Sequence, residues 1–510
     1  MYKLVLSFLF IIFFCFVTFS QSKNDYKWIF GSSYQVEKKI VKGCIIDFKN
    51  KGRIDTADMH DGVANHNAPI SDRDGNLLFY FNGCRIIDST FLLMDNGDSI
   101  NYGKTWRGYC GNWSWYPGPQ NSIVLTDPGN ISDGNNGYYL IHKRQELISE
   151  PFVQVSIPEL YYSYIDMNSN NGRGSVIKKD QVIFKTRDLV SGYLSACKHA
   201  NGKDWWLIQM EQDTKMYFKI LLTKDGFKVD SQSIDESLIF TPGSGVGQAV
   251  FTPDGSKWIT NSSYDESLII DFDREDGMLS NLIRVMPQDS GIYYGVAVSP
   301  NSRFVYLSND YDLFQVDLWA NDIPESIEHI AHIDSFPDYY FSSAFGQAQL
   351  APDCKIYIVS STTNNYLHVI NKPNEKGKAC DFQQHSVYLP HRNYNNCIPN
   401  FPHFRMDEAE ICDPTITSMF GEAVWYRRDL EIFPNPSSGL FNIRLPDVGP
   451  GKLVVLNLEG QLVLQRDLSN VIPEVDIDIS DHSNGSYFIE FYPDKSTERI
   501  FYCAKVVKLK

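Results

Sequence analysis

The amino-acid sequence predicts an all-β protein in which a seven-bladed β-propeller is followed by a small C-terminal β-sandwich. Two repeats predict the propeller: a short apolar strand ending in Asp or Asn, and a tight turn leading into a second apolar strand. A composition with 34 Gly, 24 Pro and 14% aromatic residues fits many short strands joined by turns.

The first repeat occurs seven times, and most copies are roughly fifty residues apart. A strand-based period of this length is typical of a propeller, in which each repeat forms one four-stranded blade. The step between the second and third copies is longer, which indicates an insertion. The copies are residues 44–47, 85–88, 162–166, 217–221, 268–271, 313–317 and 367–371.

The second repeat runs in phase with the first and predicts the hairpin between the first two strands of a blade. Its Pro, Asp, Asn and Gly residues favour tight reversals. Small residues precede several of these turns, as expected of innermost strands that pack closely around the axis. The turns are residues 70–76, 198–203, 251–256, 298–303 and 350–355.

The two ends of the repeat region predict how the ring closes. The first and last copies are each incomplete alone. We therefore expect residues 27–31 and 400–404 to share one blade, because this closure removes two exposed sheet edges.

The C-terminal region contains five motifs in a fixed order, from a rigid Pro-Asn-Pro segment with a turn to a final Lys-Val-Val-Lys strand. In this order the motifs resemble the type A C-terminal sorting domain of the type IX secretion system of Bacteroidota. The resemblance implies export across the outer membrane with the secretion machinery as a partner. The motif residues are Pro434, Asn435, Pro436, Gly439, Gly460, Gly485, Tyr487 and Lys505.

Residues 1–20 have the pattern of a secretory signal peptide, with a positive start, an apolar run and small residues before Gln21. No other stretch reaches ~18 uninterrupted apolar residues, so we expect no membrane span in the mature chain. We divide the chain into signal peptide 1–20, propeller 21–405, linker 406–430 and sorting domain 431–510. The expected destination, reached through the periplasm, is the outer cell surface or the medium.

The region 27–405 also resembles secreted Bacteroidota propellers of the WD40/YVTN type. The shared elements are a Trp-x-Phe-Gly start at Trp28 and a Ser-Asp-x-x-Gly-Asn-Leu-Leu-Phe-Tyr segment at residues 71–80. This resemblance implies the fold and secretion, and it names no activity.

The net charge indicates which partners are not expected, and the cysteine content indicates which disulfides can form. A net charge of −16 repels phosphate backbones, so nucleic acid is not an expected partner. Of ten cysteines, Cys15 lies in the signal peptide, so an odd number remains and at least one thiol stays unpaired. Secretion favours disulfides, and Cys380 with Cys397 is the predicted pair because these residues flank a loop.

The longer step of the first repeat contains an aromatic-rich insertion. Its rings either pack on the propeller or form an exposed platform for a sugar ring or an apolar peptide group. The sequence leaves both interpretations open. The candidate ligand-binding residues are Trp106, Tyr109, Trp113, Trp115 and Tyr116.

Familiar catalytic signatures such as Gly-x-Ser-x-Gly, His-Glu-x-x-His and a Walker loop are absent from the sequence. Residues 127–137 and 271–277 faintly resemble calcium loops, but we favour turns there. We predict no cofactor; a structural calcium ion is the one alternative, and no motif supports it. His199 and His403 are expected to make structural hydrogen bonds.

Two main classes of function remain, beside a purely structural role. We favour a secreted or cell-surface binding and adhesion module for a glycan or peptide. The alternative is a secreted hydrolase or lyase with its site at the mouth of the propeller channel. The fold alone does not decide between them.

Overall fold

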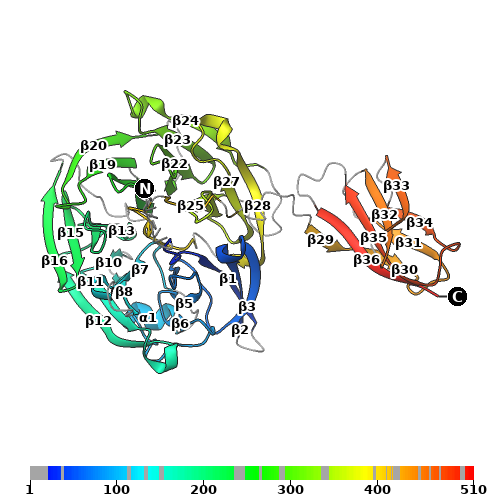
Figure 1. The fold of residues 1–510 in the computed structure, drawn as a ribbon, viewed down its shortest axis with the longest axis horizontal. Helices are drawn as coiled ribbons and strands as arrows, with labels where there is room; N and C mark the ends of the chain where they lie inside the picture. Colours follow the sequence, from blue (N-terminus) through cyan, green and yellow to red (C-terminus); the bar gives the residue numbers. More distant parts are fainter. Residues whose placement is uncertain are drawn as a thin grey trace, which may run out of the picture. The chain divides into compact units, whose positions relative to one another are not determined.

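The computed structural model separates into two compact units, Met1–Ser418 and Met419–Lys510. Figure 1 shows the sheets of the first unit arranged in succession around a central axis, from blue to yellow. The predicted signal peptide lies outside the described residues. The structure describes residues 21–509 except 36–39, 112–115, 131–135, 149–153, 235–246, 263–266, 287–292, 335–343, 394–397, 409, 415, 417–425, 446–449, 459–460, 470–472 and 494–499.

Within the described part of the first unit, five antiparallel sheets have four strands each. The first strands of successive sheets contact one another, so they line the axis. The sheets are β7 (Ser122–Thr126), β8 (Gly137–Lys143), β11 (Glu159–Asp166) and β12 (Ser175–Lys185); β13 (Ser195–Lys198), β14 (Trp205–Met210), β15 (Met216–Thr223) and β16 (Gly226–Ser233); β17 (Gly247–Phe251), β18 (Lys257–Ser262), β19 (Ser267–Phe272) and β20 (Leu279–Val285); β21 (Tyr293–Val298), β22 (Phe304–Asn309), β23 (Asp312–Asp317) and β24 (Glu328–His332); β25 (Phe345–Leu350), β26 (Ile356–Ser360), β27 (Asn364–Ile370) and β28 (Phe382–Asn393).

Two further sheets of this unit have three described strands each, β1 (Lys27–Gln35), β2 (Ile40–Asp47) and β3 (Arg53–Met59), and β4 (Ala68–Ser71), β5 (Leu77–Phe81) and β6 (Ile86–Asp88). The short elements are helix α1 (Lys104–Tyr109), the hairpin β9 (Glu146–Ile148) and β10 (Gln154–Ser156), and the 3-10 turns η1 (Phe48–Asn50), η2 (Pro128–Asn130), η3 (Asn170–Gly172), η4 (Pro324–Ser326) and η5 (Gly377–Cys380). The unit is the predicted β-propeller. Its predicted number of seven blades stays a prediction, because two sheets are incomplete within the described ranges.

Both sequence repeats occupy fixed structural positions. Apart from residues 44–47 in β2, each copy of the first repeat falls in the third strand of its sheet. The second repeat forms the turn between the first two strands. In one such turn the Thr252 amide donates to the Lys257 carbonyl at 3.0 Å, and Gly255 has a φ of 72°, a conformation natural to glycine. Ser302 and Cys354 adopt the same left-handed conformation in equivalent turns.

Glutamine side chains near the axis bond to the inner strands of other sheets. The Gln248 amide donates to the Ala348 carbonyl at 2.6 Å and accepts from the Val296 and Ala348 amides at 3.0 and 2.9 Å. Gln120 makes the matching pair of bonds with the backbone of Ala249. These bonds satisfy buried backbone groups that no sheet ladder reaches.

The predicted closure by a shared blade is wrong. β1 pairs with β2, and residues 398–404 form no strand. This segment instead enters the channel, where the Asn400 side chain donates to the Ser122 and Leu194 carbonyls at 2.9 and 2.8 Å. Pro402 has no amide hydrogen to contribute to a ladder, which disfavours a strand here. The ring instead closes where β1 and β2 pack against β28, while residues 398–404 lie in the channel.

Residues 405–413 continue from the channel segment and bind it to the segment that precedes β1. The Arg405 guanidinium binds both Asp25 carboxylate oxygens at 2.6 and 2.8 Å, and both side chains are buried. A disulfide joins Cys412 to Cys354. We call residues 398–413 the closing segment.

The predicted Cys380–Cys397 disulfide is not formed, because Cys380 is a buried thiol without a disulfide partner. Its sulfur interacts with the Tyr306 hydroxyl, and burial raises its pKa. Cys397 lies outside the described residues. The described disulfides are Cys84–Cys110 and Cys354–Cys412.

The second unit is a β-sandwich. One sheet has the order β29 (Tyr426–Asp429), β36 (Ile500–Lys508), β35 (Gly485–Pro493), β32 (Gly451–Asn457) and β33 (Leu462–Leu468). The other has the order β30 (Glu431–Phe433), β31 (Leu440–Arg444) and β34 (Glu474–Asp478). The two sheets share one core, in which Phe441, Ile477 and Ile489 are buried.

The sorting-motif residues tie the two sheets together. The Asn435 side chain donates to the Lys505 carbonyl and accepts from the Val507 amide, both at 2.9 Å. Gly439 has a φ of 122°, and a Cβ there would lie 2.6 Å from the Ser480 Cα, so only glycine fits. The Tyr487 hydroxyl donates to the Ser483 carbonyl at 2.6 Å. Of the other motif residues, Pro434, Pro436 and Gly485 flank these contacts, while Gly460 lies outside the described residues.

We expect Asp25→Asn to destabilise the propeller by about 3–5 kcal/mol, because the substitution leaves the buried Arg405 charge uncompensated. Urea unfolding of the mature protein measures this loss. Asp55→Asn is the control, because its partner Arg53 is exposed and the change should cost under ~1 kcal/mol. Equal losses for the two variants would contradict the prediction.

Candidate functional site

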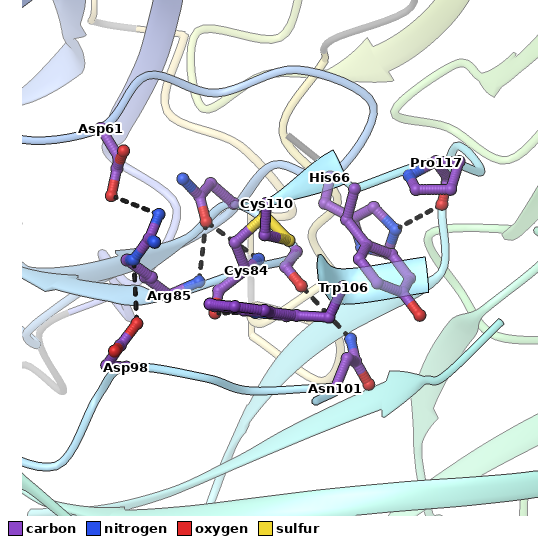
Figure 2. The surroundings of a disulfide bond; sticks show 12 residues. Asp61, His66, Cys84, Arg85, Asp98, Asn101, Trp106, Cys110 and Pro117 are labelled. Carbon is purple, nitrogen blue, oxygen red and sulfur yellow. Dashed lines mark hydrogen bonds and ion pairs between the residues drawn. A yellow bond between two sulfur atoms is a disulfide. The ribbon is translucent and has the colours of Figure 1, made fainter. Parts of the chain in front are cut away.

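The aromatic insertion between β6 and β7 folds onto the propeller through a disulfide. Cys84, in the turn after β5, bonds to Cys110 at the end of α1 with a Cα–Cα distance of 5.6 Å. Figure 2 shows this disulfide beside the Trp106 ring. The Trp106 Nε1 donates to the Cys84 carbonyl at 3.3 Å. Two residues of α1, Trp106 and Cys110, are therefore attached to the turn that contains Cys84.

Arg85 anchors the other side of the Trp106 ring. Its Nε lies 2.9 Å from Asp98 Oδ1, and its Nη1 lies 3.2 Å from Asp61 Oδ2 (Figure 2). The guanidinium carbon lies 5.5 Å from the Trp106 ring centroid, in cation–π range. The His60 ring continues this line of polar groups, 3.0 Å from the Asp61 carboxylate.

Exposed groups surround Trp106 on the solvent side. Tyr102 is 50% exposed, and its ring centroid lies 5.3 Å from that of Trp106. The Arg107 guanidinium lies 5.8 Å from the Tyr102 ring, and Tyr109 is half-buried on the same helix. We call Tyr102, Trp106, Arg107 and Arg85 the aromatic platform.

The other predicted ligand-binding residues do not join the platform within the described structure. Tyr116 is fully buried, with its hydroxyl donating to the Gln145 carbonyl at 3.1 Å and accepting from the Gln145 amide at 2.9 Å. Burial raises the pKa of this hydroxyl. Tyr116 is therefore a packing residue, which corrects its candidate role. Trp113 and Trp115 lie outside the described residues.

Two buried histidines form hydrogen bonds beneath the insertion, within the propeller. His66 lies 3.2 Å from the Ser122 hydroxyl and 3.1 Å from the Pro117 carbonyl, and burial lowers its pKa to about 4. His142 lies 2.7 Å from the Asn101 amide oxygen and 3.1 Å from Ser163, and burial lowers its pKa to about 3. Both rings are neutral at physiological pH and act as hydrogen-bonding spacers.

The platform and the closing segment lie at opposite ends of the propeller strands. Cys84 follows a second strand, and α1 contacts β9, which also follows a second strand. The closing segment bonds to the turn after the first strand β25, through Asp413 and the Pro352 carbonyl. In an antiparallel meander these two kinds of turn lie at opposite ends. The platform therefore lies at the end of the strands opposite the turn that Asp413 contacts.

In the described part of the channel, two cavities lie beside the closing segment, and each has room for about one or two water molecules. His403 lies there with Nε2 3.1 Å from the Phe251 carbonyl, and burial lowers its pKa to about 4. His199 accepts from the Asn201 amide at 3.0 Å and stacks on Trp206. The described lining residues include no Asp or Glu: they are Asn65, Asn67, Gln120, Ser122, Ser195, Ala196, Gln248–Phe251, Ala297, Val298, Gln347–Leu350, Ile398 and Asn400–His403.

The described residues contain no group of three or more His, Cys, Asp or Glu side chains arranged to hold a metal ion. In the two Asp-rich segments, Asp127 accepts from the Tyr164 hydroxyl at 2.6 Å, and Asp271 pairs with Lys257. A search of the same residues finds no helix that is long and apolar enough to cross a membrane.

Comparison with known proteins identifies the second unit. A family described as the secretion system C-terminal sorting domain matches residues 431–501. The chain therefore carries a type IX sorting domain, which directs a protein to the outer cell surface or the medium. No curated protein matches the sequence.

Solved structures with a similar architecture include several propellers. One is a proposed 6-phosphogluconolactonase from Bacteroides fragilis, with 12% identity, coverage of 72% of this chain and 97% of that chain, and a TM-score of 0.42. Another is the β-propeller domain of Cps50 (Swd1) from Myceliophteria thermophila, with 9% identity, coverage of 66% and 93%, and a TM-score of 0.35. These likenesses concern the fold and not the activity.

Replacing Cys84 and Cys110 together by Ser should destabilise the propeller by about 3–4 kcal/mol, because the bond closes a loop between residues 26 positions apart. Urea unfolding under oxidising conditions measures the loss. The matched double variant at Cys354 and Cys412, 58 positions apart, should lose slightly more. A loss under ~1 kcal/mol for the Cys84/Cys110 variant would contradict the prediction that this disulfide stabilises the propeller.

Propeller stability should fall between pH 7 and pH 5. His66, His142 and His403 have folded pKa values near 4, 3 and 4, below the unfolded value of about 6.5. The unfolded chain therefore binds more protons as the pH falls through 6.5, at a cost of about 2 kcal/mol per histidine by pH 5. Urea unfolding midpoints at pH 7 and pH 5 test this prediction. The difference between the two midpoints should be smaller in the His142→Gln variant. A midpoint independent of pH would contradict the assignment.

Proposed function

We propose that this protein is a secreted or cell-surface propeller that binds a ligand through the aromatic platform. The observation that carries the proposal is a pair of solvent-facing rings, Tyr102 and Trp106, of which Trp106 is fixed by Arg85 and by the disulfide at the end of its helix. A rigid aromatic surface loses little conformational entropy when a ligand stacks on it. Adhesion or capture outside the cell fits this arrangement and the sorting domain.

The platform chemistry favours a glycan or a peptide as ligand. Ring faces accept the apolar faces of sugars or apolar side chains, while Arg107 supplies charged donors beside them. Asp61 and Asp98 already pair with Arg85, so they position the cation and are not a catalytic pair. The net charge of −16 argues against a nucleic acid.

The alternative, a hydrolase or lyase acting at the channel mouth, has less support. The closing segment fills the channel, and the described lining offers backbone groups, amides and small side chains. A glycosidase of the usual kind needs two carboxyl groups flanking a substrate.

We further propose the domain limits inferred from the sequence. Residues 1–20 are a signal peptide, the propeller begins at residue 21 and the sorting domain ends at residue 510. The linker predicted at 406–430 is shorter, because Cys412 is bonded to Cys354 of the propeller and β29 pairs with β36 of the sandwich. The Arg405–Asp25 pair supports the limits of the propeller, because it joins its two ends.

The double variant Tyr102→Ala/Trp106→Ala should lower ligand affinity at least tenfold, a loss of about 1.4 kcal/mol or more, because both stacking surfaces are removed. Glycan and peptide arrays with the propeller identify the ligand, and calorimetry with that ligand measures the affinity.

Trp319→Ala is the matched control, because Trp319 is 64% exposed and lies 5.0 Å from the Arg303 guanidinium elsewhere on the ring. This variant should bind as the parent does. Equal affinity of the platform variant and the parent for every captured ligand would overturn the proposed function.

A further inference from the structure

Two exposed cations lie beside the rings of the aromatic platform. Lys104 and Arg107 are three positions apart on α1, so their side chains lie on the same face of the helix. The Arg107 guanidinium lies 5.8 Å from the Tyr102 ring centroid, which keeps this cation next to the ring. Within the described part of the chain neither Lys104 nor Arg107 forms an ion pair, so both charges face solvent.

The other arginines around the platform are already paired with carboxylates. Arg85 binds two aspartates (Figure 2). Arg144, which passes beside Gly103 at the start of α1, pairs with Glu159 at 3.3 Å. Carboxylates outnumber cations 62 to 46 in this chain, so composition does not explain why two neighbouring cations have no carboxylate partner. These two charges are available to a ligand.

The rings and the cations together offer two kinds of contact. Tyr102 is 50% exposed, and its ring is inclined by 49° to the Trp106 ring. The apolar C–H face of a sugar packs on an exposed aromatic ring. Guanidinium and ammonium groups at the ring edge bind a carboxylate or a sulfate through charge-assisted hydrogen bonds. A sugar ring that carries an anionic group satisfies both contacts at once.

We propose that the ligand of the aromatic platform is an acidic glycan, whose sugar ring stacks on Tyr102 while its carboxylate or sulfate group binds Arg107 and Lys104. This inference rests on the proposed function, because it names the ligand class of the same site. An acidic peptide fits the site less well. Peptides commonly bind along a free sheet edge or in an apolar groove, whereas these rings lie on a six-residue helix and the segment before it.

Calorimetry of the mature protein with matched pairs of oligosaccharides tests the ligand class. The acidic probes are a galacturonate oligosaccharide and a sulfated galactose oligosaccharide, and their neutral counterparts are the methyl ester and the desulfated form. At least one acidic probe should bind about tenfold more tightly than its neutral counterpart. This preference should weaken as salt is added, because both cations are exposed. The acidic probe that binds shows whether the platform recognises a carboxylate or a sulfate.

The double variant Lys104→Gln/Arg107→Gln should reduce the preference for the acidic probe to under about threefold, because it removes both charges and keeps both rings. Lys224→Gln/Lys228→Gln is the matched control. It removes two exposed lysines of the β15–β16 hairpin, which form no ion pair within the described residues. The control should keep the parent's preference. Both variants should unfold at the parent's temperature, because all four side chains are exposed.

Equal binding of the acidic and neutral probes overturns the inference, and so does an unchanged preference in the Lys104/Arg107 variant. Failure of both acidic probes to bind, or tighter binding of a peptide of Glu and Tyr residues, overturns it as well. The proposed function is tested separately by Tyr102→Ala/Trp106→Ala. If neutral probes bind to the parent and not to that variant, the platform is a binding site and its ligand is not acidic.

Discussion

The buried ion pair between Arg405 and Asp25 is the constraint on which ring closure depends. Two buried charges are tolerable only when their geometry is bidentate and their remaining donors are satisfied. Arg405 meets this condition by also donating to the Ser22 and Ile411 carbonyls. Because Arg405 follows the channel segment directly, the pair also holds Asn400 against the inner strands. One interaction thus joins the two ends of the propeller region and holds the segment that occupies the channel, which leaves the outer surface of the ring for a ligand.

Sequence periodicity was sufficient to predict the strands and turns of the sheets, because each repeat depends on residues close together in the chain. A turn that needs a left-handed residue and a strand that alternates in burial both leave marks within a few positions. Closure left no such mark. Residues 400–404 read as an apolar strand, yet their partners are the carbonyls of Ser122, Leu194 and Phe251, which are distant in the sequence. Pro402 and the charged Arg405 beside buried Phe404 were the available signals against a strand.

The sequence predicted where the candidate site lies but not which of its aromatic side chains are exposed. The insertion is recognised because two copies of the repeat are farther apart than the others, and its aromatic residues can be read directly from the sequence. Which rings face solvent is decided elsewhere: Tyr116 is buried because its hydroxyl meets the Gln145 backbone, whereas Tyr102, outside the predicted set, is exposed. Arg85 also escaped prediction, because its role depends on Asp61 and Asp98 converging from separate turns.

The cysteines show how regular and irregular segments are stabilised differently. Each described disulfide joins a turn to an irregular segment or the end of a short helix, Cys84 to the insertion and Cys354 to the closing segment. Three of the buried cysteines without disulfides, Cys44, Cys197 and Cys503, lie in strands whose ladders already fix the backbone. Cross-links gain most where few backbone hydrogen bonds restrict the chain. Cys380 is the exception, because it lies in the 3-10 turn η5 and is nevertheless a buried thiol, in contact with the Tyr306 hydroxyl.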